Sequence, residues 1–184
     1  MINIRPLSKE DLTYKIKWYN DPRINKYLHY EKPFTYNTTL EWFEKIKNDE
    51  TRFENVIEYR ETNEYIPVGI IGLFSIDYKN KKAGIYITIG DINFQRKGIA
   101  YNAMVKFMKY CFQKYELQKI YLYTDVENVV AQNLYKKVGF TKEGVLRREL
   151  FFKGRYIDRL YYGILREEFE NKYQMESRWY YGNG

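Results

Sequence analysis

The segment from Gln95 to Ala100 has the composition and spacing most suited to binding an anionic ligand. It follows an apolar run and leads into a long amphipathic pattern, so it is expected to form a loop that ends at a helix. The first turn of a helix presents unpaired backbone N–H groups and the positive end of the helix dipole, which together bind phosphate. Gly98 lets a phosphate approach the backbone because it has no Cβ, while Arg96 and Lys97 add positive charge. The segment therefore predicts a phosphate site, although an ordinary basic helix start has the same composition.

A second segment, from Asp125 to Phe140, carries a phenol at a defined position of a short helix. Asn128 is expected to cap this helix, and Gly139 to end it in the left-handed conformation. Tyr135 lies in its last turn, where a phenol can donate a proton to a leaving group. The alternative is a core tyrosine bonded to a backbone carbonyl. With 21 tyrosines in the chain, the residue type alone carries little information.

Apolar periodicity predicts the elements that position these two segments. Strands are expected at 3–5, 52–60, 65–76, 83–89, 119–124, 141–152 and 156–165, and helices from Ser8, Asp21 and Thr38 and at 98–115, 128–138 and 166–172. Short polar turns between the three middle strands favour antiparallel pairing, whereas a strand–helix–strand unit follows them. The order predicts an α/β sheet with mixed strand directions. Cys111 shares the apolar face of helix 98–115, so it is expected to pack in the core.

Length, charge and rare residues restrict the class of protein. The chain has 184 residues, enough for a single domain over 1–172 followed by a tail at 173–184. One cysteine and one histidine exclude an intramolecular disulfide and any metal site built from several Cys or His ligands. No stretch approaches the ~20 apolar residues that span a bilayer. We therefore expect a cytoplasmic protein without metal or membrane partner.

The formal charge of +7 suggests an anionic partner. A nucleic-acid-binding module is one class of protein with such a charge, and tyrosines can stack on bases. However, the basic residues are scattered over every expected element and do not gather on one helix or strand. Nucleic acid is therefore an unfavoured partner, and a phosphorylated cofactor explains the charge equally well.

The two segments, together with the ending of the chain, resemble the GCN5-related N-acetyltransferase superfamily. The ending consists of Glu143-Gly144-Val145-Leu146-Arg147 and Gly154-Arg155-Tyr156-Ile157-Asp158. The likeness covers roughly residues 2–170 and is strongest to the branch of ribosomal-protein N-terminal acetyltransferases, which also includes spermidine and amino-sugar acetyltransferases. It implies the acyl-CoA N-acyltransferase-like mixed sheet: an antiparallel N-terminal half, one splayed parallel strand pair, and helices on both faces.

The resemblance also implies acetyl-CoA as cosubstrate and assigns residues to it. Strand 83–89 would pair with the pantetheine amides, the loop and first turn of helix 98–115 would hold the pyrophosphate, and Lys136 or Lys137 would reach the adenosine end. Tyr135 would stand near the thioester sulfur as general acid. The residues expected to bind the cofactor are Ile87, Thr88, Ile89, Gln95, Arg96, Lys97, Gly98, Ile99, Ala100, Asn128, Asn133, Tyr135 and Lys136.

The resemblance implies a primary amine that attacks acetyl-CoA directly in a ternary complex. The acceptor pocket is expected between residues 21–38 and the hairpin 145–160, with His29, Tyr30, Glu31 and Phe34 as candidate contacts. Glu31 is the one acidic residue of loop 29–37, which favours a peptide N-terminus or an amino sugar over a polyamine.

Several alternatives stay open from the sequence. Gly84 stands where relatives often carry a glutamate, so no general base is assigned. Glu31, His29 and a water chain to a backbone carbonyl are the candidates, although a lone loop histidine is more often a solvated surface residue. A non-catalytic acetyl-CoA-binding protein is the second function considered, and a second copy of the chain is a candidate partner.

Overall fold

The computed structural model describes residues 1–174. Its elements are β1 (Ile2–Pro6), η1 (Lys9–Asp11), α1 (Leu12–Asn20), α2 (Pro22–Asn25), α3 (Tyr36–Ile46), β2 (Phe53–Tyr59), β3 (Ile66–Asp77), β4 (Lys82–Ile89), η2 (Ile92–Phe94), α4 (Ile99–Lys114), β5 (Lys119–Asp125), α5 (Val129–Val138), β6 (Thr141–Phe152), β7 (Arg155–Leu165) and α6 (Arg166–Tyr173). The expected tail at 173–184 lies almost entirely outside the described residues, so the proposed domain boundary stays a prediction.

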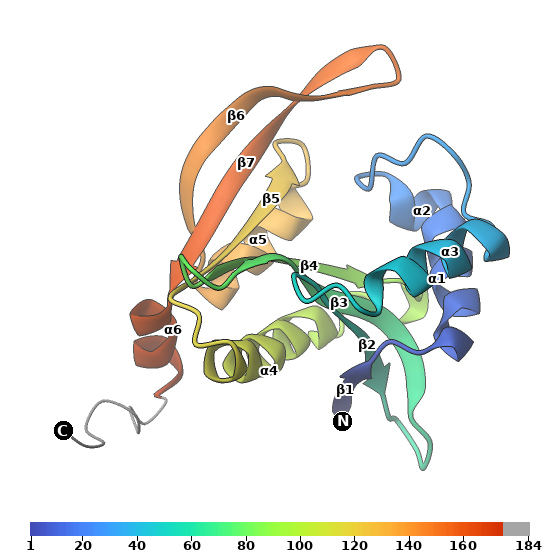
Figure 1. Ribbon diagram of the computed structural model, residues 1–184, viewed down its shortest axis with the longest axis horizontal. Helices are drawn as coiled ribbons and strands as arrows, with labels where there is room; N and C mark the ends of the chain where they lie inside the picture. Colours follow the sequence, from blue (N-terminus) through green and yellow to red (C-terminus); the bar gives the residue numbers. More distant parts are fainter. Residues whose placement is uncertain (175–184) are drawn as a thin grey trace.

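The strands form one seven-stranded sheet in the order β1-β2-β3-β4-β5-β7-β6 (Figure 1). All neighbours are antiparallel except β4 and β5, which are parallel. This parallel pair is connected through α4, because parallel neighbours need a crossover connection. The predicted mixed sheet with an antiparallel N-terminal half is confirmed.

Helices cover both faces of the sheet, because the strands alternate their apolar residues between the two sides. On one face, α4 packs Met104, Phe107 and Met108 against the buried side chains of β3 and β4. On the other face, α1 places Trp18 and Tyr19 against Ile70 of β3. Cys111 is fully buried on the packed side of α4, which confirms its expected place in the core.

Helix α3 begins earlier than the sequence predicts. Its N-cap is Thr35, whose hydroxyl accepts a hydrogen bond from the Thr38 N–H at 3.3 Å, so the expected cap at Thr38 is wrong. Two threonines three residues apart can each act as a cap, and Thr38 here takes the reciprocal position of the capping box. The loop before α3 is consequently shorter than expected and ends at Thr35. Among residues 1–174 no helix is both long and apolar enough to cross a membrane.

Candidate active site

A cleft of about 1400 Å³ opens where β4 and β5 diverge. The two strands pair at three positions, from Lys82 with Lys119 to Gly84 with Tyr121, and separate beyond them. The remaining edge of β4, from Ile85 to Ile89, therefore has backbone groups that no neighbouring strand uses on the β5 side. This confirms the predicted splayed pair.

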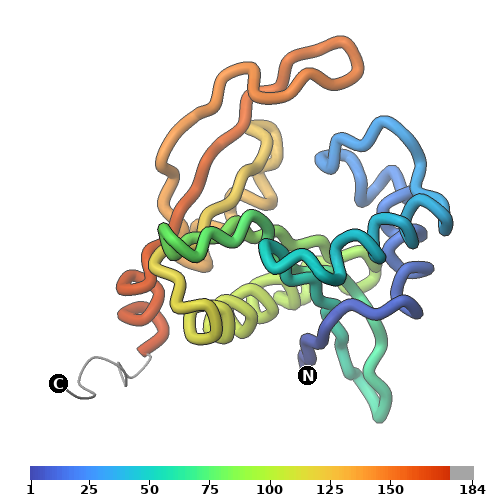
Figure 2. Tube along the Cα trace, viewed as in Figure 1, coloured from blue at the N-terminus to red at the C-terminus, as the bar shows by residue number. Residues whose placement is uncertain are grey.

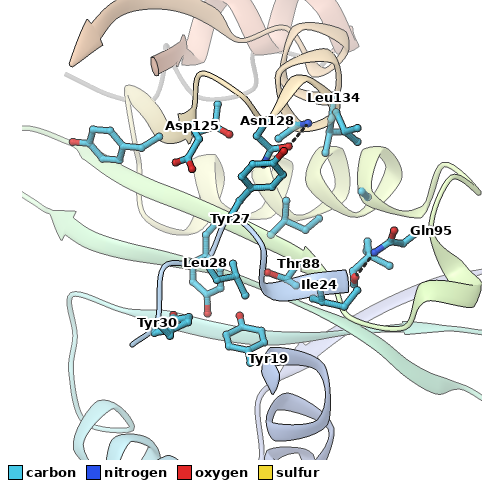
Figure 3. A pocket seen from close by; sticks show the side chains of 18 of the residues that line it. Tyr19, Ile24, Tyr27, Leu28, Tyr30, Thr88, Gln95, Asp125, Asn128 and Leu134 are labelled. Atoms are coloured by element: carbon cyan, nitrogen blue, oxygen red, sulfur yellow. Dashed lines mark hydrogen bonds between the residues drawn. The ribbon is translucent and has the colours of Figure 1, made fainter. Parts of the chain in front are cut away.

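The walls of the cleft come from both halves of the chain. Figure 3 shows Tyr19 and Tyr30 on one side of the cleft, Asp125 and Asn128 on the other, and Tyr27 between them. Thr88 from β4 and Gln95 from the following loop lie along the same space. One cavity thus joins the N-terminal helices to the C-terminal end of β5.

At one end of the cleft the loop before α4 has the geometry of an anion site. Gly98 caps α4 with φ +76°, a left-handed conformation that favours glycine, and Arg96 before it has φ +60°. A Cβ added to Gly98 would meet no atom closer than the Asn102 amide nitrogen at 3.9 Å, so open space lies beside this backbone. Gln95 donates a hydrogen bond to the Ile89 carbonyl at 3.2 Å, which ties the loop to the end of β4.

The six expected loop residues do not all face the cleft. Gln95, Arg96, Gly98, Ile99 and Ala100 line it, whereas Lys97 does not. The Lys97 ammonium instead pairs with Glu61 at 3.0 Å and lies over the ring of Phe94. Its side chain thus lies at Glu61 and not in the cleft, and the expected role of Lys97 in binding the cofactor stays a prediction.

Helix α5 presents a different set of residues from the one predicted. Asn128 lines the cleft and caps the helix, its Oδ1 accepting from the Ala131 N–H at 3.2 Å, which leaves its side-chain N–H groups for a ligand. Leu134 and Lys137 line the cleft as well, but Asn133 and Lys136 do not. Residues three apart share a helix face, so the face that carries Leu134 also carries Lys137 and turns the other two outward.

Tyr135 lies where the sequence placed it, in the wall of the cleft with 8% of its surface exposed. Burial raises the pKa of its phenol to about 12, and the nearby Arg159 guanidinium opposes that rise. The group is therefore protonated throughout the neutral range and can act as a proton donor.

The loop between α2 and α3 covers the cleft. Tyr30, Glu31 and Phe34 line it as expected. His29 does not line it and is not solvated: its side chain is 10% exposed, and its Nε2 lies 2.6 Å from Oδ2 of Asp125. His29 therefore does not fit the alternative of a solvated surface histidine, because its loop brings it to the end of β5, and its role as a substrate contact stays a prediction.

The hairpin of β6 and β7 contributes less to the cleft than predicted. Of residues 145–160, Arg159 alone lines it. The tip of the hairpin approaches the α2–α3 loop farther out (Figure 2). There the Phe152 ring packs edge-on against His29 at a centroid distance of 5.1 Å. Phe151 is 62% exposed, so it does not form a pocket wall.

The far wall is formed by residues that sequence reasoning missed, namely Lys15 and Tyr19 of α1, Trp42 of α3, and Arg52 before β2. The spacing of Lys15 in the sequence could have indicated its place in this wall. It lies three residues after Leu12 and four before Tyr19, both buried, so helical periodicity places it on the inner face of α1.

Packing within the sheet explains why residue 84 is a glycine. The ring of Phe74 on β3 packs directly over it, and a Cβ at this position would overlap that ring. A glutamate therefore cannot be accommodated at residue 84 without moving Phe74.

Comparisons with known proteins agree with this geometry. The model of the acetyltransferase (GNAT) domain family matches residues 2–141. This chain belongs to the GNAT family. It is an acetyl-CoA-dependent N-acetyltransferase with no cluster of metal-ligating side chains in residues 1–174.

Individual GNAT relatives cover most of the chain. The spermidine N(1)-acetyltransferase of Escherichia coli K12 is 31% identical over 156 residues, 84% of this chain and 81% of the relative. The crystal structure of spermidine N-acetyltransferase from Vibrio cholerae in complex with CoA and spermine has a TM-score of 0.82 and 31% identity, covering 91% of this chain and 97% of that one. The ribosomal N-acetyltransferase-like protein YdaF of Bacillus subtilis is 33% identical over 104 residues, 56% of each chain. The resemblance inferred from the motifs is confirmed.

Proposed function

We propose that this GNAT enzyme transfers the acetyl group in a ternary complex, by direct attack of a neutral primary amine on the thioester. The observation that carries the proposal is the continuity of the cleft. The same cavity runs from the N-terminus of α4, along the unpaired edge of β4, to the pocket beneath the α2–α3 loop. Both substrates therefore have room in one space, and a covalent acetyl-enzyme is not needed.

The proposed binding of acetyl-CoA uses the backbone more than side chains. The free edge at Ile87, Thr88 and Ile89 pairs with the pantetheine amides as an added strand would. The N–H groups at the start of α4 hold the pyrophosphate. The Asn128 amide contacts the pantetheine arm, and of the two lysines expected to reach the adenosine end, Lys137 is the one that lines the cleft.

The proposed chemistry balances with one proton moved. The amine nitrogen bonds to the carbonyl carbon while negative charge develops on the carbonyl oxygen, where backbone N–H groups near Ile89 stabilise it. The carbon–sulfur bond then breaks, and Tyr135 donates its proton to the departing thiolate. The nitrogen gives up its extra proton to solvent, and solvent returns a proton to the Tyr135 phenolate, so that the net transfer is one proton from the amine to the thiolate.

Two observations bear on the class of amine, and they favour different acceptors: the activities of the relatives and the carboxylates of the pocket. The spermidine acetyltransferase relatives make a polyamine the first acceptor to test. The comparisons give no support to the expected preference for a peptide N-terminus or an amino sugar. In the pocket, however, Glu31 is the carboxylate that no cation of residues 1–174 pairs with, whereas Asp125 and Glu127 are paired. A polycation would be better held by several free carboxylates.

A panel of amines tests the proposal. Purified protein is incubated with acetyl-CoA and spermidine, glucosamine or a short peptide, and free CoA is measured with a thiol reagent. We expect CoA release that depends on at least one amine. When the concentrations of acetyl-CoA and the amine are both varied, double-reciprocal plots of the rate should give intersecting lines. Parallel lines, typical of a covalent intermediate, would contradict direct attack.

The pH profile gives a second test. With the pKa of Tyr135 raised to about 12, the acid stays protonated across the assay range. The attacking amine is reactive only when deprotonated, so kcat/KM should rise with pH from 6 to 9. A flat profile with a confirmed acceptor would rule out attack by the neutral amine.

A further inference from the structure

Lys15 is a buried lysine in the wall of the acceptor end of the cleft. Its relative exposure is 4%, and it lines the cleft together with Tyr19 and Trp42. Lysine is almost never this buried unless it is paired. Its position therefore requires a compensating interaction.

Aromatic rings supply part of that compensation. The Lys15 Nζ lies 3.9 Å from the ring centroid of Tyr19, 4.4 Å from that of Trp42 and 6.0 Å from that of Phe34. Rings arranged in this way recognise ligand cations in other proteins. Here the protein's own ammonium fills the cage, so a substrate ammonium cannot use it.

The charges around Lys15 leave the wall positive. Glu54 is already held by Arg52 at 2.7 Å and accepts a hydrogen bond from the Tyr86 hydroxyl. Two cations thus face one carboxylate. Within residues 1–174 the Lys15 ammonium pairs with no carboxylate at salt-bridge distance, although Lys15 lines the cleft.

Burial lowers the pKa of Lys15 to about 8, against an opposing effect of the Glu54 carboxylate. The buried cation is thus unstable relative to its solvated state. An anion arriving from the cleft would relieve this penalty, because it would supply the acceptor that the protein lacks. The titratable or charged groups that face this region are Tyr19, Tyr30, Arg52, Glu54 and Tyr86.

We propose that Lys15 binds an anionic group on the acceptor, so that the substrate of this enzyme is a primary amine that also carries a carboxylate or a phosphate. The inference rests on the acetyl transfer proposed above. It makes Lys15 a specificity-determining residue that does not take part in the chemical steps.

The position of Lys15 also limits the shape of such an acceptor. The Tyr19 side chain lies between Lys15 and Thr88. Its ring contacts the Lys15 Nζ, and its hydroxyl lies beside that of Thr88, in the part of β4 that does not pair with β5. An amine held at that edge and an anion held at Lys15 would therefore belong to one small molecule. A polyamine would instead place a second ammonium next to Lys15, where the two like charges repel.

Matched acceptor pairs test this directly. The carboxylate arm compares γ-aminobutyrate with its amide, and the phosphate arm compares glucosamine 6-phosphate with glucosamine. Putrescine and spermidine serve as cationic acceptors. We expect kcat/KM to be about tenfold to a hundredfold higher for the anionic member of at least one pair, the range for a hydrogen bond to a charged group.

Three variants separate a binding role from a structural one. Lys15→Met keeps the length of the side chain but removes the charge, and should abolish the preference for the anion while leaving the KM for acetyl-CoA unchanged. Lys15→Arg retains the charge and should keep part of the preference. Lys17→Met removes an exposed lysine from the same helix and should change nothing.

The pH dependence provides a readout that a structural lysine would not move. For one anionic acceptor, the ratio of wild-type to Lys15→Met kcat/KM should fall as pH rises above about 8, where Lys15 loses its charge. Because the same amine is used on both sides, its own ionisation cancels from the ratio.

The outcomes are distinct. Equal kcat/KM for both members of both pairs, or a preference that survives in Lys15→Met, overturns the anion site but leaves acetyl transfer intact. Thermal denaturation with each amine supplies a measurement that needs no turnover: anionic amines should raise the Tm of the wild type and not of Lys15→Met. If no amine is acetylated and no anionic amine raises the Tm, both the anion site and the proposed reaction fail, whereas a selective Tm shift without turnover contradicts the reaction alone.

Discussion

Tyr135 combines a nearly complete burial with direct access to the cleft. Its ring packs near those of Phe140 and Tyr162, each at a centroid distance of 6.0 Å, so its orientation is held by the core. A phenol positioned in this way reaches a leaving group without the entropy cost of ordering a surface side chain.

Replacing Tyr135 with phenylalanine should therefore affect chemistry more than binding. We expect Tyr135→Phe to slow turnover by about 10²–10⁴, the range for a positioned acid, with acetyl-CoA affinity unchanged. Steady-state kinetics and calorimetry measure the two effects separately.

Tyr162→Phe is the matched control, because its hydroxyl is buried without a hydrogen-bond partner in residues 1–174. Its removal should leave turnover unchanged and the fold at least as stable. A fall in rate of less than threefold in Tyr135→Phe would assign the proton to another donor.

At the scale of elements, the loop before α4 and the turn of the β6–β7 hairpin contain glycines of the same conformation. Gly98 has φ +76° and Gly154 has φ +78°, and neither has a neighbour that a Cβ would overlap. Gly98 faces the cleft, whereas Gly154 does not. Substitutions at the two glycines therefore distinguish the effect of backbone strain from the effect of a lost ligand contact.

Alanine at either glycine should cost about 1–2 kcal/mol of stability, because an L-residue is strained in the left-handed region. Gly98→Ala should in addition weaken acetyl-CoA binding by about tenfold or more, since its Cβ enters the space beside the helix N-terminus. Calorimetry on both variants measures the affinity. Unchanged affinity in a folded Gly98→Ala protein would remove the pyrophosphate from this loop.

The cover of the cleft depends on contacts between the α2–α3 loop and the end of β5. His29 bonds to Asp125, the Tyr27 hydroxyl donates to the Glu127 carbonyl at 3.3 Å, and Arg159 approaches Asp125 at 3.7 Å. His29 and Asp125 are both nearly buried. Removal of the Asp125 carboxylate therefore leaves the His29 ring and the Arg159 guanidinium without this partner.

Asp125→Ala should lower the free energy of unfolding by about 3 kcal/mol, as expected when one member of a buried polar pair is lost. Urea denaturation measures the change. Glu127→Ala, two residues farther, removes an exposed pair with Arg155 and should cost less than about 1 kcal/mol. Equal losses in the two variants would show that the His29 bridge contributes little to stability.

At the scale of the whole molecule, the gap between β4 and β5 is a weakness in an otherwise continuous sheet. A ligand that pairs with the free edge of β4 completes it and joins the two halves of the chain. Acetyl-CoA at a hundred times its Kd should raise the Tm by about 5–10 °C, since it adds about 2.7 kcal/mol to a chain of this size. Thermal denaturation with and without the ligand checks this, and a protein whose Tm does not move would contradict binding in the gap.

Local sequence determined most of the elements that line the cleft. The strand positions, the Gly98 turn, the capping of α5 by Asn128 and the place of Tyr135 all follow from periodicity and turn chemistry within a few residues. The splayed pair was an expectation from the GNAT resemblance that these short segments carry, and not from their periodicity.

Tertiary structure decided which side chains face the cleft. Lys97 and Lys136 turn away from it, and Lys137 turns toward it, because helix phase and a partner such as Glu61 set the direction. His29 and Asp125 meet across 96 residues of chain, a pairing that no local pattern contains. Lys15 faces the acceptor end because α1 and α3 pack on the same face of the sheet. Contacts between distant segments depend on how elements dock, and it is docking that brings the buried Lys15 into the wall of the cleft.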